Sequence, residues 1–515
     1  MHPMTITSRS NEPIPLGQMA IYTQLGLSIP PPAVQSYAVS AARRTRELTT
    51  HTEEHYPLHY NTDGSIKENL RFAIKHEPLD LRIIFEALVA LGEEGLIDWV
   101  HDEPSGEFSR RSWFLYETLT GHILDLDPAQ LGRYVDVLNP KRHYVGVPRI
   151  SARHRVRNNL LGSIHLCPVL RRTHKLETMI QANLADEARA LTKSHTPEIL
   201  ARAVSFLYAK ETRSFFAIEG EPPSRMREER FLQALRSIES FHPNDKDELI
   251  RLQQSIVDPR YASDNWRTSQ NFISATTRQF GQDVHYICPR PEDVDTLMEG
   301  WMALTDRLMQ SPLDAVLVAA VCAFAFVFIH PFEDGNGRIH RFIIHYGLAK
   351  RGFSPPGIIF PVSAAILRNK LAYEQVLDGF SHPMLAAMEW EWADNGDIVV
   401  RNNTLNLYRF FDATALAEYL YDRVAETVRV DFKEELEFLA TYDAVYIAVK
   451  SIVDMPTRRA ALLVKICLQN GGHLSNNKRK DFIELTDEEI VQIEYAIKGA
   501  IQKTGGVLPD SGNML

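Results

Sequence analysis

Apolar residues recur at helical spacing along most of the chain. Asp80 is suited to cap a helix, and Leu81, Ile84, Phe85 and Leu88 follow it as one apolar face. The same pattern predicts a helical stretch from Val34 to about residue 160, with Gly121 as one helix stop. Further helices are expected over residues 178–217, 293–309, 314–329, 339–350, 368–377 and 405–500. Thr486 and Glu489 are expected to form a capping box at the start of the last helix. The hydrophobic pattern therefore predicts a mainly α protein.

One segment follows a different pattern. Phe272–Ile273 and Val284–Ile287 are rich in β-forming residues and flank a polar stretch that contains Gly281. Pro289 and Pro291 then end the extended pattern. These features predict a short β-hairpin between helices.

The longest apolar run, from Ala315 to Ile329, is shorter than the ~20 residues that a membrane-spanning helix needs. We interpret it as a fully buried core helix and expect no membrane partner. The stretch from Met1 to Leu16 has no basic segment followed by an apolar run, so no signal peptide is expected. The four cysteines form no C-x-x-C pair, which favours buried, reduced thiols and a cytoplasmic protein.

Composition shifts suggest four regions. Residues 1–35, with Pro30, Pro31 and Pro32 in a row, are expected to be a flexible lead; residues 36–175 a helical N-terminal domain; 176–395 a central core; and 396–515 a helical C-terminal domain. The last domain contains Lys478-Arg479-Lys480 near a glycine turn, which leaves a helix-turn-helix or winged-helix-like fold open. The net charge of −10 disfavours nucleic acid as the main partner, and a solvated loop is the simpler interpretation.

The candidate catalytic and phosphate-binding residues lie between His330 and Arg341, in the segment HPFEDGNGRIHR. Gly335 and Gly337 allow a ligand to approach the main chain, and the N–H groups at the start of the next helix can bind an anion. Arg338 and Arg341 lie three residues apart on a helix, so both can reach phosphate oxygens at that same end.

Three other side chains complete the set. His330 can accept a proton near neutral pH, Asp334 is a hard oxygen ligand suited to Mg²⁺, and Asn336 can orient a phosphate. Each residue alone has an ordinary interpretation: a helix cap, a turn, or a solvated arginine face. Their occurrence together in one short segment instead indicates chemistry at a phosphorus centre.

This segment matches the Fic motif H-x-F-x-[DE]-G-N-G-R-x-x-R at every defined position. The chain resembles Fic proteins over residues ~195–380, by the motif and by Arg267-Thr268 before the hairpin. The resemblance implies an all-helical Fic core in which the hairpin forms a flap over the nucleotide. Helical N-terminal and C-terminal regions flank this core.

The resemblance also implies a role for each residue. His330 is expected to be the general base, Asp334 to hold Mg²⁺, and Phe332 to anchor the loop. The phosphates are expected to contact Gly335, Asn336, Gly337, Arg338 and, at the γ-phosphate, Arg341. The hairpin backbone at Ile273, Ser274, Ala275 and Thr276 is expected over the nucleotide, where it can also pair with a target segment, and Tyr373 is expected near adenine.

A second resemblance lies upstream. Ser214 to Gly220 is similar to the family's inhibitory motif [ST]-x-x-x-E-[GN], although Phe215 stands where Ser or Thr is expected. The resemblance implies that Glu219 pairs with Arg341 and blocks the γ-phosphate, in the class II arrangement. A solvated glutamate at a helix end is the alternative interpretation.

Together these features imply an autoinhibited protein adenylyltransferase. It would use ATP and Mg²⁺ to place AMP on a Tyr, Thr or Ser hydroxyl of another protein. The alternatives are AMP removal, transfer of another nucleotidyl or phosphoryl group, and a DNA-linked regulatory protein with a relic nucleotide site. A homodimer is left open.

Overall fold

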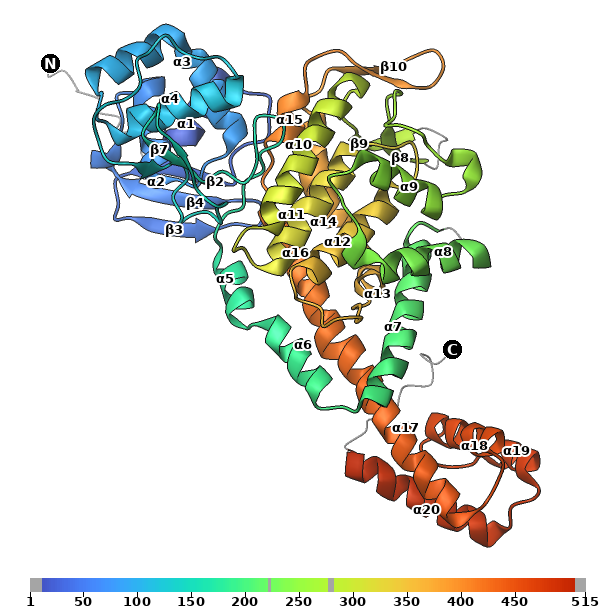
Figure 1. Ribbon diagram of the computed structural model, residues 1–515. Coiled ribbons are helices and arrows are strands. Elements are labelled where there is room, and N and C mark those ends of the chain that lie inside the picture. Colours follow the sequence, from blue (N-terminus) through green and yellow to red (C-terminus); the bar gives the residue numbers. More distant parts are fainter. Residues whose placement is uncertain (1–11, 221–223, 277–281, 505–515) are drawn as a thin grey trace, which may run out of the picture. The chain divides into compact units, whose positions relative to one another are not determined.

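The computed structural model of the protein describes residues 12–220, 224–276 and 282–504. The chain divides into two compact units, coloured along the sequence in Figure 1. The first comprises Met1–Gln181, Pro223–Arg351 and Asn369–Tyr421, and the second comprises Ala182–Pro222, Gly352–Arg368 and Asp422–Leu515. The prediction of a mainly α protein is confirmed, because helices form most of both units.

The described residues of the first unit begin with a four-stranded sheet. Its strands are β1 (Ile14–Leu16), β2 (Val34–Val39), β3 (Arg44–Glu47) and β4 (Thr52–Pro57), in the order β1-β2-β4-β3. The helical prediction from Val34 onward was wrong here, because β2 and β4 pair in parallel through contacts that local spacing does not reveal.

Helix α1 (Gly17–Leu25) follows β1, and distant residues hold this junction in place. Asn69 accepts a hydrogen bond from the Gly17 N–H at 3.0 Å, and Glu77 accepts one from the Gln18 N–H at 2.9 Å. Ile21 is fully buried in the core. The described part of the expected lead is therefore folded into the unit.

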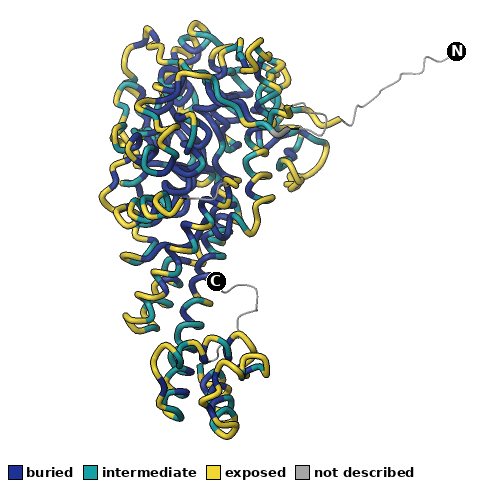
Figure 2. Tube along the Cα trace, turned by 90° about the vertical axis from the view of Figure 1, so that its right-hand side faces the viewer, coloured by how far each residue is buried: buried dark blue, intermediate teal, exposed yellow. Residues whose placement is uncertain are grey.

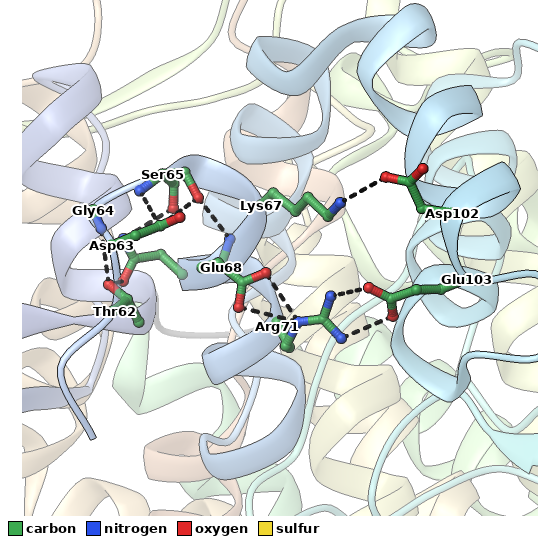
Figure 3. Close-up of polar contacts among 10 residues, drawn as sticks. Thr62, Asp63, Gly64, Ser65, Lys67, Glu68, Arg71, Asp102 and Glu103 are labelled. Carbon is green, nitrogen blue, oxygen red and sulfur yellow. Dashed lines mark hydrogen bonds and ion pairs between the residues drawn. The ribbon is translucent and has the colours of Figure 1, made fainter. Parts of the chain in front are cut away.

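Three helices pack beside this sheet: α2 (Ile66–His76), α3 (Leu81–Asp102) and α4 (Glu107–Thr120). Figure 3 shows how α2 and α3 are joined: the Arg71 guanidinium donates to both oxygens of Glu103 and also to Glu68. Asp80 caps α3 by accepting from the Arg82 N–H, and Gly121 ends α4 in a left-handed conformation, as predicted.

Residues 122–173 contain no helix, which contradicts the expectation of a mostly helical region. They form loops and a three-stranded sheet of β5 (Val135–Asp136), β6 (Arg149–Ser151) and β7 (Val156–Asn158). Buried side chains hold the loops: Asn159 bonds both backbone groups of Leu138, and Arg110 donates to several backbone carbonyls. These pairings span long sequence distances and leave no periodic signal.

Helices form most of the rest of the first unit. Its elements are α5 (His174–Gln181), α8 (Arg225–Arg236), α9 (Lys246–Ile256), α10 (Pro291–Met309), α11 (Ala315–Ile329), α12 (Asn336–Lys350), α14 (Lys370–Leu385), β10 (Trp390–Trp392), β11 (Ile398–Val400), α15 (Leu405–Arg409) and the start of α16 (Thr414–Glu426). Short 3₁₀ turns lie at Leu58–Tyr60, Ile238–Ser240 and Pro259–Tyr261.

Helix α11 confirms the prediction of a buried core helix. Val316 to Ile329 are all buried, and α11 contacts α10 and α12. Figure 2 colours the buried parts of the chain dark blue. The Trp301 indole of α10 donates to the Cys322 carbonyl at 2.8 Å. None of the described helices has the length and apolar character needed to cross a membrane. The four cysteines are buried and unbridged, as expected, and burial raises the pKa of the Cys322 thiol to about 12.

The predicted hairpin is confirmed. Strands β8 (Phe272–Thr276) and β9 (Gln282–Ile287) pair antiparallel, with a bulge between Ile273 and Ser274. Gly281, expected in its turn, lies outside the described residues. The hairpin follows α9 and leads into α10.

The second unit comprises α6 (Leu184–Lys193), α7 (Pro197–Ile218), α13 (Val362–Arg368), a π-helical segment (Thr427–Phe432), α17 (Lys433–Ile452), α18 (Thr457–Gln469), α19 (Asn476–Arg479), a 3₁₀ turn (Lys480–Phe482) and α20 (Asp487–Thr504). Asp431 ties this unit together by accepting from Lys210 of α7 and Arg368 of α13.

The C-terminal region of this unit departs from two expectations. Residues 422–504 contain no strand, so the winged-helix alternative does not describe them. Lys478 and Arg479 lie in the short helix α19 instead of a loop. The predicted capping box is confirmed: Thr486 accepts from the Glu489 N–H, and Glu489 accepts from the Thr486 N–H. The boundaries expected at residues 35, 175 and 395 stay predictions.

Candidate active site

His330 ends the buried helix α11. Its backbone is left-handed, with φ 52° and ψ 58°, and this conformation turns the chain out of the helix into the loop before α12. The imidazole Nδ1 lies 3.2 Å from the Val327 carbonyl oxygen. A proton on Nδ1 shared with that carbonyl makes Nε2 the proton-accepting nitrogen, which is the form that a general base requires.

Asn336 closes the loop between the two helices. Its Oδ1 accepts from the Phe332 N–H at 3.0 Å, and its Nδ2 donates to the Phe332 carbonyl at 2.7 Å. Phe332 is buried and packs edge-on against Trp266 at 5.1 Å, in accord with its expected anchoring role. The structure thus places the Asn336 side chain against the loop backbone, so the Asn336 N–H, at the start of α12, is the group available to a phosphate.

Gly335 precedes α12 in a left-handed conformation with φ 93°. A Cβ atom at this position would lie 2.8 Å from Cγ1 of Val257, closer than a side chain tolerates. Both the backbone angle and the close approach therefore require glycine. Because Gly335 and Gly337 carry no side chain, the N–H groups at this end of α12 can be reached by an anion.

Asp334 and Arg338 form an ion pair across one turn, with Oδ1 and a guanidinium nitrogen 2.6 Å apart. The Arg338 guanidinium also donates to the Ile256 carbonyl at 3.2 Å. Arg338 and Arg341 are only 2% and 1% exposed, which excludes a solvated arginine face. Two buried guanidinium groups on one helix instead concentrate positive charge near its N-terminus.

Asp334 fits the requirements of a magnesium ion shared with a nucleotide. Its side chain is 37% exposed, and its Oδ1 accepts from Arg338 and from the Gly335 N–H at 2.6 Å. The second carboxylate oxygen has no hydrogen-bond donor among the described residues, and Mg²⁺ bound to phosphates needs as little as one carboxylate. No cluster of three or more metal-binding side chains occurs in the described part of the chain.

The hairpin is joined to this loop by side chains that the sequence did not single out. Ser269 donates to Glu333 at 2.5 Å, just before β8. The Tyr286 hydroxyl of β9 donates to the Phe328 carbonyl of α11, and burial raises the pKa of Tyr286 well above its usual value. This phenol therefore stays protonated and keeps its hydrogen bond at any physiological pH.

A cavity of about 450 Å³ lies between the hairpin, the end of α11 and α14. This volume is in the range of small-ligand sites. Its lining residues are Ile273, Ser274, His285, Tyr286, Val327, Phe328, Glu374, Leu377, Asp378 and Ser381. Of the expected flap residues, Ile273 and Ser274 reach this cavity, whereas the side chains of Ala275 and Thr276 lie outside the described ones.

Tyr373 does not line the cavity. It is buried on another face of α14, where its ring stacks on His340 with centroids 6.2 Å apart and contacts Tyr419 at 6.0 Å. The cavity wall is formed instead by Glu374, Leu377, Asp378 and Ser381. Their spacing places them on one helical face, but the spacing alone does not show that this face meets the cavity.

Glu219 ends helix α7 in the second unit and is exposed. Its N–H donates to the Phe216 carbonyl at 3.2 Å, and Gly220 follows in a left-handed conformation. Phe215, which departs from the inhibitory motif, is fully buried and packs against Phe216. Because Arg341 belongs to the first unit, pairing of Glu219 with Arg341 stays a prediction.

Comparison with known proteins finds a family match for part of the chain. Residues 243–348 match the model of the Fic/DOC family. A protein adenylyltransferase Fic from Nematostella vectensis is 29% identical over 118 residues, which are 22% of this chain and 24% of that protein. One from Culex quinquefasciatus is 39% identical over 77 residues, which are 14% of this chain and 15% of that protein. The chain thus spans no more than about a quarter of these relatives.

Among solved structures, a Fic family protein from Desulfovibrio desulfuricans G20 aligns over 58% of this chain and 88% of its own, with 17% identity. The TM-score of this alignment is 0.36. The family match covers α9 to α12, including the hairpin and the whole motif. The chain therefore carries a Fic domain, and we describe it as a Fic-domain protein.

Proposed function

We propose that this protein is an adenylyltransferase that moves AMP from ATP to a hydroxyl side chain of another protein. The observation that carries the proposal is the complete motif from His330 to Arg341, folded as a helix end, a clamped loop and a helix start. This motif lies beside a cavity of nucleoside size. The relatives named as protein adenylyltransferases support the same reaction.

In this proposal the nucleoside occupies the cavity under the hairpin, and the triphosphate extends toward α12. The N–H groups of Asn336 and Gly337 contact the phosphates at the helix N-terminus, where the helix dipole favours negative charge, and Gly335 has no side chain to block their approach. Arg338 binds the phosphates that leave as pyrophosphate, and Arg341 holds the γ-phosphate. In this proposal Tyr373 is not part of the cavity wall. It supports α12 through the stacking of its ring on His340.

Asp334 would hold Mg²⁺, which would supply positive charge next to the phosphates when bound. Arg338, which pairs with Asp334, would then bind phosphate oxygens with its guanidinium group. The pair at 2.6 Å therefore keeps both side chains in position before ATP binds.

His330 takes the proton from the target hydroxyl, and the resulting oxygen attacks the α-phosphorus. A new phosphorus–oxygen bond forms to the target while the bond to the β-phosphate oxygen breaks, and pyrophosphate leaves with the charge. An extended target segment would pair with the hairpin backbone at Ile273, Ser274, Ala275 and Thr276, so that main-chain bonds present its hydroxyl to His330.

Glu219 is proposed as the inhibitor. A carboxylate that pairs with Arg341 would repel the γ-phosphate and occupy its hydrogen-bond donors. Glu219 lies at the C-terminal end of helix α7 and is exposed. A cytoplasmic location and a homodimer belong to this proposal as expectations.

The test uses the Glu219→Gly variant, incubated in parallel with α-labelled and γ-labelled ATP and a cell extract. Label retained on protein only from the α position supports adenylyl transfer. Label from the γ position would show phosphoryl transfer, and no label from either would contradict the proposal. Addition of His330→Ala in the same background separates enzymatic labelling from background labelling.

A further inference from the structure

Arg267 lies between the hairpin and the motif and is 4% exposed. Its Nε donates to the His330 carbonyl at 2.7 Å, one terminal nitrogen to Ser269 at 2.8 Å, and the other to Pro289 at 2.7 Å. Its own N–H donates to the Pro331 carbonyl at 2.8 Å. One side chain thus joins the residue after α11 to both ends of the hairpin.

The chemistry of these contacts explains why arginine stands there. The last carbonyls of a helix have no partner within the helix and carry partial negative charge. Arg267 satisfies the carbonyl of His330, and it also approaches that of Ile329 at 3.5 Å. A planar guanidinium can donate in three directions at once, whereas a lysine ammonium is a compact charge on a flexible stem.

From this geometry we infer that Arg267 is a positioning residue that fixes His330 relative to the hairpin. The inference rests on the proposed function, because it concerns the base and the flap of that reaction. Ser269 precedes β8 and Pro289 follows β9, so the guanidinium holds the two legs of the hairpin at a fixed distance from the His330 backbone. His330, as the general base, and the hairpin over the nucleotide then move together.

A change at Arg267 should affect turnover more than nucleotide binding. The proposed phosphate contacts come from α12, to which Arg267 makes no hydrogen bond among the described residues, whereas the backbone that carries His330 is held directly. A misplacement of about 1 Å at a catalytic group can cost on the order of 100-fold in rate. We therefore expect Arg267→Lys to lower kcat by roughly 30–100-fold with less than about a threefold change in nucleotide Kd.

The experiment measures transfer from α-labelled ATP and nucleotide affinity in the Glu219→Gly background. Arg267→Lys is compared with Arg110→Lys, because Arg110 is 1% exposed and also donates to backbone carbonyls, those of Gly106, Arg133 and Arg155. Arg110→Lys should lower stability yet leave kcat per folded molecule unchanged. Equal kcat values for the two variants would overturn the inference.

A second variant gives a readout that a general loss of packing would not move. Arg267→Ala leaves a guanidinium-shaped space, and ethylguanidinium at millimolar concentration should restore part of kcat, whereas ethylammonium should not. Rescue by neither compound would overturn the inference if Arg267→Ala retains the parent's nucleotide affinity. If it has lost that affinity, the comparison of Arg267→Lys with Arg110→Lys decides.

Hydrogen exchange followed by mass spectrometry separates this inference from the proposed function. In Arg267→Lys, peptides covering residues 269–276 and 326–332 should both exchange faster, while those covering 149–158 should not. If the Glu219→Gly parent transfers no AMP, the proposed reaction fails, and joint loosening of the two segments still supports the link. Unchanged exchange in both segments would contradict it.

Discussion

The clamp between Asn336 and Phe332 makes a quantitative prediction. Asn336→Ala removes one acceptor and one donor from a buried site, so the Phe332 N–H and carbonyl lose their partners. Each buried backbone group left without a partner costs ~1–3 kcal/mol, so the loop should lose roughly 3 kcal/mol of local stability, allowing for some water entry. Asn336→Asp keeps the acceptor but sets a carboxylate against the Phe332 carbonyl, so it should cost at least as much near neutral pH.

Hydrogen exchange of peptides covering residues 326–342 measures this loss. A loss of roughly 3 kcal/mol corresponds to about 100-fold faster exchange of the loop amides, if they exchange by local opening. Transfer of AMP in the Glu219→Gly background should fall with it, because the clamped loop contains Asp334 and directly follows His330.

The chain offers a matched control. Asn159 bonds both backbone groups of Leu138 at 2.8 Å, is 1% exposed, and lies outside the motif. Asn159→Ala should loosen residues 135–160 to a similar extent without an effect on kcat. The reasoning would be refuted if Asn336→Ala left the exchange of the loop unchanged while ATP affinity collapsed, because the side chain would then act as a phosphate ligand.

Three further outcomes are expected. Gly335→Ala should destabilise the protein more than Gly64→Ala in urea unfolding, because both glycines have positive φ but only Gly335 would place a Cβ against Val257; equal losses would contradict this. His330→Ala should abolish transfer and retain ATP binding by calorimetry, since the imidazole is not a proposed phosphate ligand. Burial raises the pKa of Glu77 to about 7 from 4.5, so the folded state holds this proton more tightly. Raising the pH from about 4.5 to about 7 should therefore lower the free energy of unfolding by roughly 3 kcal/mol. Glu77→Gln should remove this part of the pH dependence. A variant whose stability depends on pH as the parent's does would contradict the prediction.

Local patterns predicted the parts of the fold that local interactions determine. The cap at Asp80, the stop at Gly121 and the capping box at Thr486 depend on residues a few positions apart. The buried helix α11 follows from its uniform apolar character, and the hairpin from β-forming residues on both sides of a polar stretch. The strands at residues 34–57 were missed because β2 pairs with β4, and a parallel pair is defined by a partner distant in sequence.

The candidate site divides in the same way. The identities of His330, Asp334 and Arg338 could be read from the motif, because their chemistry and their spacing belong to one short segment. The position of Tyr373 could not, because the pattern of α14 does not say which face meets the cavity and which meets His340. The role of the Asn336 side chain also differs from the prediction. It forms a hydrogen bond with the backbone of Phe332, four residues earlier, and does not point to a ligand site.

By itself, then, the sequence determined the class of fold, the motif and the types of side chain available to a nucleotide. Only the tertiary structure decided that Arg267 joins the hairpin to His330, that Glu333 meets Ser269, and which face of α14 lines the cavity. The physical reason is that these contacts connect segments about 20–100 residues apart, and such contacts form when folding brings the segments together.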